Sequence, residues 1–354
     1  MRVVYFGTYE RRYPRNAQVI SCLRQAGVEV DERHEPVWEG REQKWGAGLS
    51  VVPRLALAEV RLLWAPRTDG DAVLVGYPGH LDLPAARRAA RGRPLVFNPL
   101  VSLVDTLVGD RGRFRPGSLP ARLLTRIDRH ALRAADLVVA DTQANADFLA
   151  ELAGLSPDRV AVCLVGAEER LFSSGWAPEE PFTAVFVGKL IPLHGLETIL
   201  EAARLAPELS VRVIGSGQLD SMLRSRPPNV EWIPWVDYER LPAELRRAGC
   251  ALGIFGTSDK AGRVIPNKAF QALACGVPLV TADTPAAREL LSDGESALLV
   301  PPGDPAALAE ALRSLATDPA LARRLADGGL SAFRERASEK VLGLRWRSLI
   351  EGLL

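Results

Sequence analysis

The sequence predicts an α/β protein with two doubly wound, Rossmann-like domains. Short β-branched runs alternate with helical patterns along the chain, which is typical of parallel sheets with helices on both faces. The alternation stops in the small- and proline-rich segment 173–181 and then restarts. At roughly 150 residues per domain, the 354 residues also favour two domains. We therefore expect domains at 1–173 and 174–337.

The first half contains five strand-like runs and four helical patterns. The predicted strands cover 2–6, 72–76, 95–98, 137–140 and 160–165. The predicted helices cover 16–26, 83–91, 119–135 and 145–153. The segment 34–70 has weak periodicity, so no element is assigned to it.

The second half repeats this alternation. The predicted strands cover 183–187, 211–214, 230–233, 251–255 and 279–281, and the predicted helices cover 196–206, 239–248 and 267–275. A last helical pattern covers 338–354, with Leu342, Trp346, Leu349 and Ile350 on one side.

Composition excludes several classes of protein. Lys plus Arg number 44 and Asp plus Glu 43, a formal net charge of +1, whereas nucleic-acid-binding proteins usually have a larger basic excess. No run of 18 apolar residues is present, and the apolar start of the chain is too short for a signal sequence. The richness in Arg and Ala is typical of a bacterial, GC-rich genome. We expect a cytoplasmic protein that spans no membrane.

The cysteines and acidic residues predict no metal site. Cys22, Cys163, Cys250 and Cys275 are far apart, and each lies in an apolar stretch. We interpret them as small buried side chains in a reducing compartment. The acidic triplet 69–71 precedes a predicted strand rather than following one, so we interpret it as a turn.

Three turns of the second half follow predicted strands, where a doubly wound sheet binds its ligands. Residues 188–195 read Gly-Lys-Leu-Ile-Pro-Leu-His-Gly, residues 215–217 read Gly-Ser-Gly, and residues 262–268 read Gly-Arg-Val-Ile-Pro-Asn-Lys. Cations beside a helix start suit a phosphate group. A tight turn with a surface lysine is the alternative for 188–195, and close packing is the alternative for 215–217.

The third turn leads into a helix that Pro266 opens and Gly276 ends. The unsatisfied N–H groups at such a start can hold a diphosphate. Asn267 and Gln271 are four residues apart, so their side chains can face the same ligand.

These motifs resemble the retaining glycosyltransferases of family 4, which have the GT-B fold. Residues 188–195 match the family's Gly-Arg-Leu-x-x-x-Lys-Gly turn, residues 271–278 match its Glu-Ala-Met-Ala-Cys-Gly-x-Pro helix, and residues 293–304 match its closing turn. The first half is similar in the order of its strands and helices. The resemblance implies two Rossmann-like domains facing a central cleft, with the helix 338–354 packed on the first domain.

The chain departs from the family pattern at four positions. The family's two glutamates, eight positions apart, fall on Arg263 and Gln271. Lys189 replaces the usual arginine and lacks the guanidinium fork. His194 replaces the usual lysine, and a histidine is fully charged only below about pH 6.5. Gln271 can still hydrogen-bond a ribose hydroxyl. Whether these changes alter or abolish activity stays open.

The resemblance implies a nucleotide-sugar donor, with a UDP-sugar favoured over a GDP-sugar, and neither cofactor nor metal. Lys189 and His194 would neutralise the leaving diphosphate, and Lys189 and Arg263 are the expected catalytic cations. The donor-binding residues implied are Gly188, Lys189, His194, Gly215, Trp235, Val236, Arg263, Val264, Ile265, Asn267, Lys268 and Gln271.

The acceptor is expected in the first half, after its strands. The candidate acceptor-binding residues are Tyr13, Arg15, Asn16, His80, Ser102 and Asp105. The family usually has a histidine near Asp105, and we expect Asp105 to replace it as the partner or base of the acceptor hydroxyl. The cap of a helix is the alternative role of Asp105.

An arginine-rich face is predicted on the helix 119–135. Arg122, Arg126, Arg129 and Arg133 recur at helical spacing, opposite a stripe formed by Leu123, Leu124, Ile127 and Ala131. A solvated surface is one interpretation. Contact with anionic lipid head groups, at the inner face of the membrane, is the other.

The sequence thus predicts a metal-independent, retaining glycosyltransferase that moves a sugar from a nucleotide sugar to a hydroxyl of a glycan, a lipid-linked saccharide or a small molecule. Two alternatives remain, because a fold does not define a function. One is a sugar-nucleotide epimerase of the same fold. The other is a catalytically silent nucleotide-sugar-binding subunit of a partner enzyme, suggested by the missing glutamates.

Overall fold

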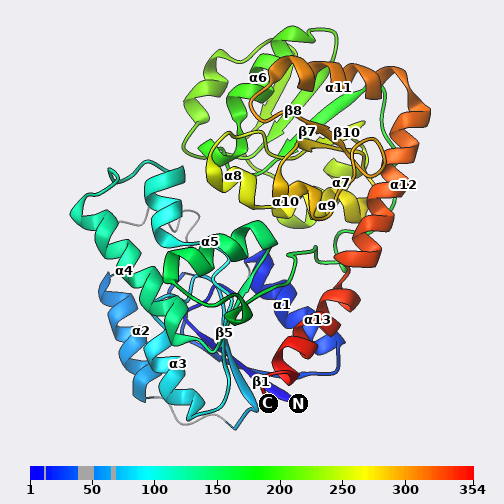
Figure 1. The fold of residues 1–354 in the computed structure, drawn as a ribbon. Helices are drawn as coiled ribbons and strands as arrows, with labels where there is room; N and C mark the ends of the chain where they lie inside the picture. The colour runs from blue at the N-terminus through cyan, green and yellow to red at the C-terminus, as the bar shows by residue number, and fades with distance from the viewer. Residues whose placement is uncertain (12, 39–51, 65–68) are drawn as a thin grey trace. The chain divides into compact units, whose positions relative to one another are not determined.

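The computed structural model describes residues 1–11, 13–38, 52–64 and 69–354, which form two compact units (Figure 1). The first unit is Met1–Leu164 with Glu339–Leu354, and the second is Val165–Ser338. Each unit has one six-stranded sheet with parallel strand pairs throughout. The predicted α/β fold with two Rossmann-like halves is confirmed.

The first unit contains a sheet in the order β2-β1-β3-β4-β5-β6. Its strands are β1 (Arg2–Gly7), β2 (Glu29–His34), β3 (Ala72–Val75), β4 (Leu95–Phe97), β5 (Leu137–Ala140) and β6 (Val160–Val162). Its helices are α1 (Pro14–Gln25), α2 (Val52–Trp64), α3 (Leu83–Ala90), η3 (Asp105–Asp110), α4 (Leu119–Ala134), α5 (Gln143–Ala153), η4 (Pro157–Arg159) and α13 (Glu339–Glu351). The strand order reverses between β1 and β3, where such sheets bind ligands.

The second unit contains a sheet in the order β12-β11-β10-β7-β8-β9. Its strands are β7 (Thr183–Val187), β8 (Ser210–Ile214), β9 (Val230–Ile233), β10 (Cys250–Leu252), β11 (Leu279–Ala282) and β12 (Leu298–Val300). Its helices are η5 (Pro192–His194), α6 (Leu196–Leu205), η6 (Asp220–Ser225), η7 (Tyr238–Arg240), α7 (Leu241–Arg246), α8 (Asp259–Arg263), α9 (Asn267–Cys275), α10 (Pro285–Arg288), α11 (Pro305–Thr317) and α12 (Pro319–Arg336). The order reverses between β7 and β10.

Two elements of the first unit lack a strong pattern in the sequence. β2 is an edge strand paired only with β1, and its Glu-Val-Asp-Glu-Arg-His sequence is half-exposed. Charged residues are usual on edge strands, where they discourage pairing with other chains. α2 lies in the segment to which no element was assigned, and only Ala58 and Leu62 of it are buried. Periodicity is weak when so little of an element faces a core.

The division between the units falls at Leu164 and Val165, nine residues before the expected boundary at 173. The segment after Val165 packs into the second unit: the ring of Phe172 contacts that of Tyr238 at 5.6 Å between centroids, and Glu168 accepts a hydrogen bond from the Tyr238 hydroxyl at 3.2 Å.

The last helix, α13, packs on α1 within the first unit. A Cβ atom on Gly343 would lie 2.2 Å from the carbonyl oxygen of Cys22, so the glycine allows the two helices to approach closely. Trp346 is buried, and its ring lies 5.7 Å from the Arg15 guanidinium.

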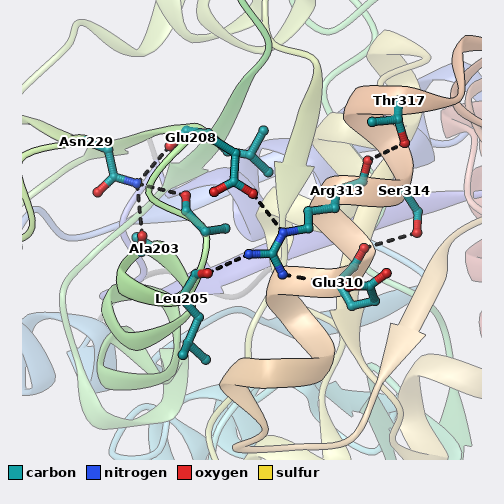
Figure 2. Close-up of polar contacts among 10 residues, drawn as sticks. Ala203, Leu205, Glu208, Asn229, Glu310, Arg313, Ser314 and Thr317 are labelled. Atoms are coloured by element: carbon teal, nitrogen blue, oxygen red, sulfur yellow. Dashed lines mark hydrogen bonds and ion pairs between the residues drawn. The ribbon is translucent and has the colours of Figure 1, made fainter.

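Polar contacts join α6 to its neighbours in the second unit (Figure 2). The Asn229 side chain donates hydrogen bonds to the carbonyl oxygens of Ala203, Ala206 and Leu209. Arg313 of α11 forms an ion pair with Glu208 at 2.7 Å and donates to the Leu205 carbonyl. These donors satisfy carbonyl groups that the end of α6 leaves open.

No helix among the described residues combines the length and apolar character that a bilayer crossing requires.

Candidate functional site

The turn after β7 brings a glycine, a lysine and a histidine together at the point where the sheet order reverses. Gly188 donates its backbone N–H to the Ile214 carbonyl at 2.9 Å. The His194 Nδ1 donates to the Lys189 carbonyl, and since a carbonyl only accepts, the imidazole proton is on Nδ1. His194 is buried, and its ring meets the edge of Phe186 at 5.5 Å. The turn therefore holds two of the expected diphosphate ligands on one loop.

The glycines at 215 and 217 allow the turn after β8 to pack against this loop. A Cβ atom on Gly215 would lie 2.0 Å from the Gly188 carbonyl oxygen, and one on Gly217 would lie 2.6 Å from the Leu190 oxygen. Gly215 also has a φ of +129°, which other residues rarely adopt. Gly215 thus supports the shape of the candidate site through close packing. Close packing was the alternative to ligand binding for this turn.

The start of α9 contributes three of the expected donor ligands. Asn267 opens the helix and is half-buried, and Lys268 follows it in a buried position. Gln271, one turn later, is buried and donates its amide to the Tyr238 hydroxyl at 3.2 Å. This contact leaves the amide oxygen of Gln271 as its acceptor group.

Tyr238 and Glu168 were not identified from the sequence. The Tyr238 hydroxyl donates to Glu168, so Gln271, Tyr238 and Glu168 form a hydrogen-bonded chain. Burial raises the pKa of the Glu168 carboxyl above its ordinary range. The sequence contains no signal for this chain, because Glu168 lies 70 residues from its partner.

The remaining expected donor ligands lie in the same unit. Arg263 ends α8 and Val264 follows it, both half-buried. Ile265 is buried, so its backbone rather than its side chain is suited to a ligand. Trp235 and the half-buried Val236 follow β9, and Trp235 is 67% exposed, as a stacking platform requires.

In the first unit, Arg15 and Asn16 are fully buried and use their polar groups internally. Arg15 donates to the carbonyls of Leu164 at 2.7 Å and Cys163 at 3.0 Å and to the Asn98 amide oxygen at 3.2–3.3 Å. Asn16 bonds to the Tyr5 hydroxyl and to both backbone groups of Tyr77. These contacts favour a structural role for both residues over acceptor binding.

Tyr13 lies beside these two residues, just before α1. Its ring lies 4.6 Å from that of Tyr77 between centroids, at an angle of 40°, and burial raises the pKa of its hydroxyl to about 12. Tyr13 therefore stays neutral at physiological pH.

Asp128 organises the segment after β4, although it was not among the expected site residues. It accepts hydrogen bonds from the Ser102 hydroxyl at 2.8 Å and from the N–H groups of Leu103 and Val104, both at 2.9 Å. His80 Nε2 lies 3.3 Å from the same carboxylate. Burial lowers the pKa of His80, and its Nδ1 bonds to the Pro78 carbonyl. Ser102 and His80 thus lie close together because both side chains contact the buried carboxylate of Asp128.

Asp105 is the first residue of η3 and is half-buried. Its N–H donates to the Ser102 hydroxyl at 3.1 Å. η3 has no side-chain cap, so the helix-capping alternative for the Asp105 carboxylate is wrong.

A cavity of about 110 Å³ opens where β1 and β3 end, the reversal point of the first sheet. It is lined by Thr8, Trp38, Leu55, Pro78, Gly79, His80, Leu81, Asp82 and Leu103. Asp82 accepts from the Thr8 N–H at 2.7 Å and hydroxyl at 3.0 Å. Burial and the neighbouring Asp82 carboxyl raise the pKa of Glu59 to about 9. Of the expected acceptor residues, only His80 lines this cavity.

The arginine-rich face of α4 is divided between two roles. Arg129 and Arg133 donate to the Leu152 and Ala153 carbonyls at the end of α5. Arg122 and Arg126 are exposed. Leu123 of the predicted apolar stripe is 59% exposed, so that stripe is only partly right; α4 instead buries a face formed by Ala121, Asp128, Ala131 and Leu132.

All four cysteines are buried. Within the described residues, His, Cys, Asp and Glu form no cluster that could hold a metal ion.

Two Rossmann-like units, each with a parallel six-stranded sheet, form the fold of the GT-B glycosyltransferases. Residues 181–318 match the family described as glycosyl transferases group 1. The match lies within the second unit, Val165–Ser338.

Two bacterial relatives show how far the similarity extends. A D-inositol 3-phosphate glycosyltransferase of Catenulispora acidiphila is 28% identical, with 91% of this chain and 79% of the relative aligned. One of Thermomonospora curvata is 30% identical, with 62% of this chain and 56% of the relative aligned. The chain thus spans little more than half the length of the second.

Solved structures agree on the fold. The sucrose-phosphate synthase of Thermosynechococcus elongatus superposes with a TM-score of 0.79 at 16% identity, covering 99% of this chain and 98% of that one. Anabaena HepE, solved in complex with UDP-glucose, gives a TM-score of 0.71 at 16% identity, with both chains fully covered. The matches favour a glycosyltransferase over the epimerase and the silent subunit.

Proposed function

We propose that the second unit binds the diphosphate of a UDP-sugar and that the enzyme transfers the sugar, with retention of configuration, to a hydroxyl acceptor. The observation that supports this proposal is the loop of Gly188, Lys189 and His194 at the reversal point of the sheet, beside the start of α9. Arg263 and the helix start add positive potential, which a departing diphosphate requires. A relative in structure, HepE, was solved with UDP-glucose.

These cations perform the neutralisation that a divalent metal provides in other transferases. We therefore propose a metal-independent reaction. Trp235, exposed after β9, stacks on the base, and the Gln271 amide oxygen accepts a hydrogen bond from a ribose hydroxyl.

Lys189→Ala should weaken binding of UDP about 10- to 100-fold and leave uridine binding unchanged. A charge-assisted hydrogen bond contributes about 1.5–3 kcal/mol, and only the diphosphate loses it. Calorimetric titrations of both ligands in a buffer that contains EDTA measure the difference in affinity. In the same buffer, sugar transfer from UDP-sugars is assayed with a panel of hydroxyl-bearing acceptors that includes D-inositol 3-phosphate.

Lys340→Ala is the control, because Lys340 is an exposed lysine of α13. Equal affinities of wild type and Lys189→Ala for UDP would reject the phosphate assignment. Loss of transfer in EDTA with rescue by magnesium would reject metal independence.

We propose that the acceptor binds in the cavity of the first unit, whose lining is largely apolar and includes Thr8, His80 and Asp82. Asp105 does not line this cavity, so a role for it as the acceptor base requires a hydroxyl on the η3 side.

We also propose that α4 contacts an anionic membrane surface. Exposed Leu119 and Leu123 flank the exposed Arg122, a combination suited to lipid head groups. Each such arginine contributes about 1 kcal/mol on an anionic surface. Reversing two of the exposed charges (Arg122→Glu, Arg126→Glu) should reduce binding to phosphatidylserine vesicles at least about tenfold.

Vesicle sedimentation measures this effect at low ionic strength, with phosphatidylcholine vesicles as the reference. The charge-matched control is Arg334→Glu with Arg336→Glu, on the exposed face of α12 in the second unit. If both double variants sediment like the wild type, the arginine-rich face is only a solvated surface.

A further inference from the structure

Lys268 is the second residue of α9 and is a buried lysine whose amine has no hydrogen-bond partner within the described residues. The side chain is 7% exposed, and Nζ is buried. Nζ lies 3.6 Å from the centre of the Phe186 ring. Burial without a hydrogen-bond partner disfavours the ammonium form, although the face of the Phe186 ring attracts a cation.

The amine points at the candidate diphosphate loop. A Cβ atom on Gly188 would lie 2.8 Å from the Lys268 Nζ and 3.5 Å from the His194 Cε1. Gly188, with a φ of +148°, therefore leaves the space that Nζ occupies. The Lys268 amine thus lies against the backbone of the loop that carries Lys189, beside the His194 ring.

Burial alone lowers the pKa of the Lys268 amine well below its ordinary value. The titratable group that faces it from another element is His194, across the Phe186 ring. Charged groups on the helices packed against α9 have other contacts: Glu244 of α7 pairs with Arg247 and Arg212, and Arg323 of α12 lies over Trp176. Within the part of the chain that the structure describes, burial is the only cause of the lowered pKa of Lys268, so no carboxylate there holds the amine charged.

We propose that Lys268 is a proton-coupled anchor for the donor: its amine is neutral in the empty site and takes up a proton when a diphosphate occupies the Gly188 loop. The inference rests on the nucleotide site proposed above. The proton comes from solvent and adds to the Nζ lone pair, and no bond of the ligand breaks. The cation is thus created only when its counter-charge arrives.

The test is calorimetric titration of UDP at pH 8.5 in buffers of different ionisation enthalpy. The terminal phosphate, with a second ionisation near pH 6, is then fully ionised and contributes no proton. We expect the wild type to take up close to one proton per UDP and its affinity to fall by up to about tenfold per pH unit. Uridine should bind without proton uptake.

Lys268→Met keeps the length and apolar stem of the side chain and should abolish both the proton uptake and the pH dependence. His194→Gln separates any contribution of the imidazole, and its proton uptake should match that of the wild type. If Lys268→Met takes up as many protons as the wild type, the proposal is overturned while UDP binding still supports the nucleotide site. If UDP does not bind the wild type at all, the proposed function itself fails.

A second readout does not require ligand. The unfolded chain keeps this lysine protonated up to about pH 10.4, whereas the folded chain does not, so the unfolded state binds more protons. The wild type should therefore gain stability relative to Lys268→Met as pH rises toward 10. Parallel stability curves of the two proteins between pH 7 and 10 would show that the buried amine is charged in the empty site, which also overturns the proposal.

Discussion

Asp128→Ala should lower the free energy of unfolding of the first unit by about 3–5 kcal/mol, the usual effect of removing one partner from a buried charged network. The carboxylate accepts three hydrogen bonds, from Ser102, Leu103 and Val104, and it lies beside His80. Without it these buried donors lose their partner. Urea denaturation, monitored by hydrogen exchange of the peptides around 95–110, measures the change in the free energy of unfolding.

Asp147→Ala is the matched control, because Asp147 is an exposed aspartate of α5 that accepts a single hydrogen bond from Gln143. Its replacement should change stability by less than about 0.5 kcal/mol. Binding of UDP by the second unit reports that the rest of the protein is intact. Asp128→Ala proteins as stable as the Asp147→Ala control would show that the segment after β4 does not depend on the buried carboxylate.

Arg15→Met should destabilise the first unit by about 3 kcal/mol or more, because two buried carbonyls and the Asn98 amide oxygen lose their donor. Thermal denaturation and urea denaturation measure the change. The control is Arg24→Met on the same helix, whose ion pair with Glu32 at 3.1 Å is half-exposed and contributes at most about 1 kcal/mol.

The same variant distinguishes a structural role of Arg15 from acceptor binding. If Arg15 has a structural role, Arg15→Met should lower the melting temperature. The KM for the acceptor should then be unchanged at temperatures where the variant is folded. If instead Arg15→Met melts like the wild type but has a raised acceptor KM, the original expectation from the sequence is right and the structural role is wrong.

Local patterns in the sequence were sufficient for the fold class and for the loops of the second unit. β-branched runs, glycines and prolines act through backbone conformation within a few residues, so the helix at 267–275 was predicted with the bounds that α9 has. Patterns failed where an element buries little surface. β2 and α2 have mostly exposed residues, and their existence depends on β1 and on the core beneath α2.

The sequence by itself determined a two-domain α/β fold, because that property follows from short-range periodicity. Its motifs carried the resemblance to glycosyltransferases and placed a lysine and a histidine in the loop after β7. The tertiary structure alone decided what individual polar side chains do. Arg15 meets a carbonyl 149 residues away, Asp128 meets Ser102 across 26 residues, and Lys268 occupies the space left by Gly188. Whether a charge is buried, paired or poised for a ligand depends on distances between segments remote in the chain, and no local pattern contains those distances.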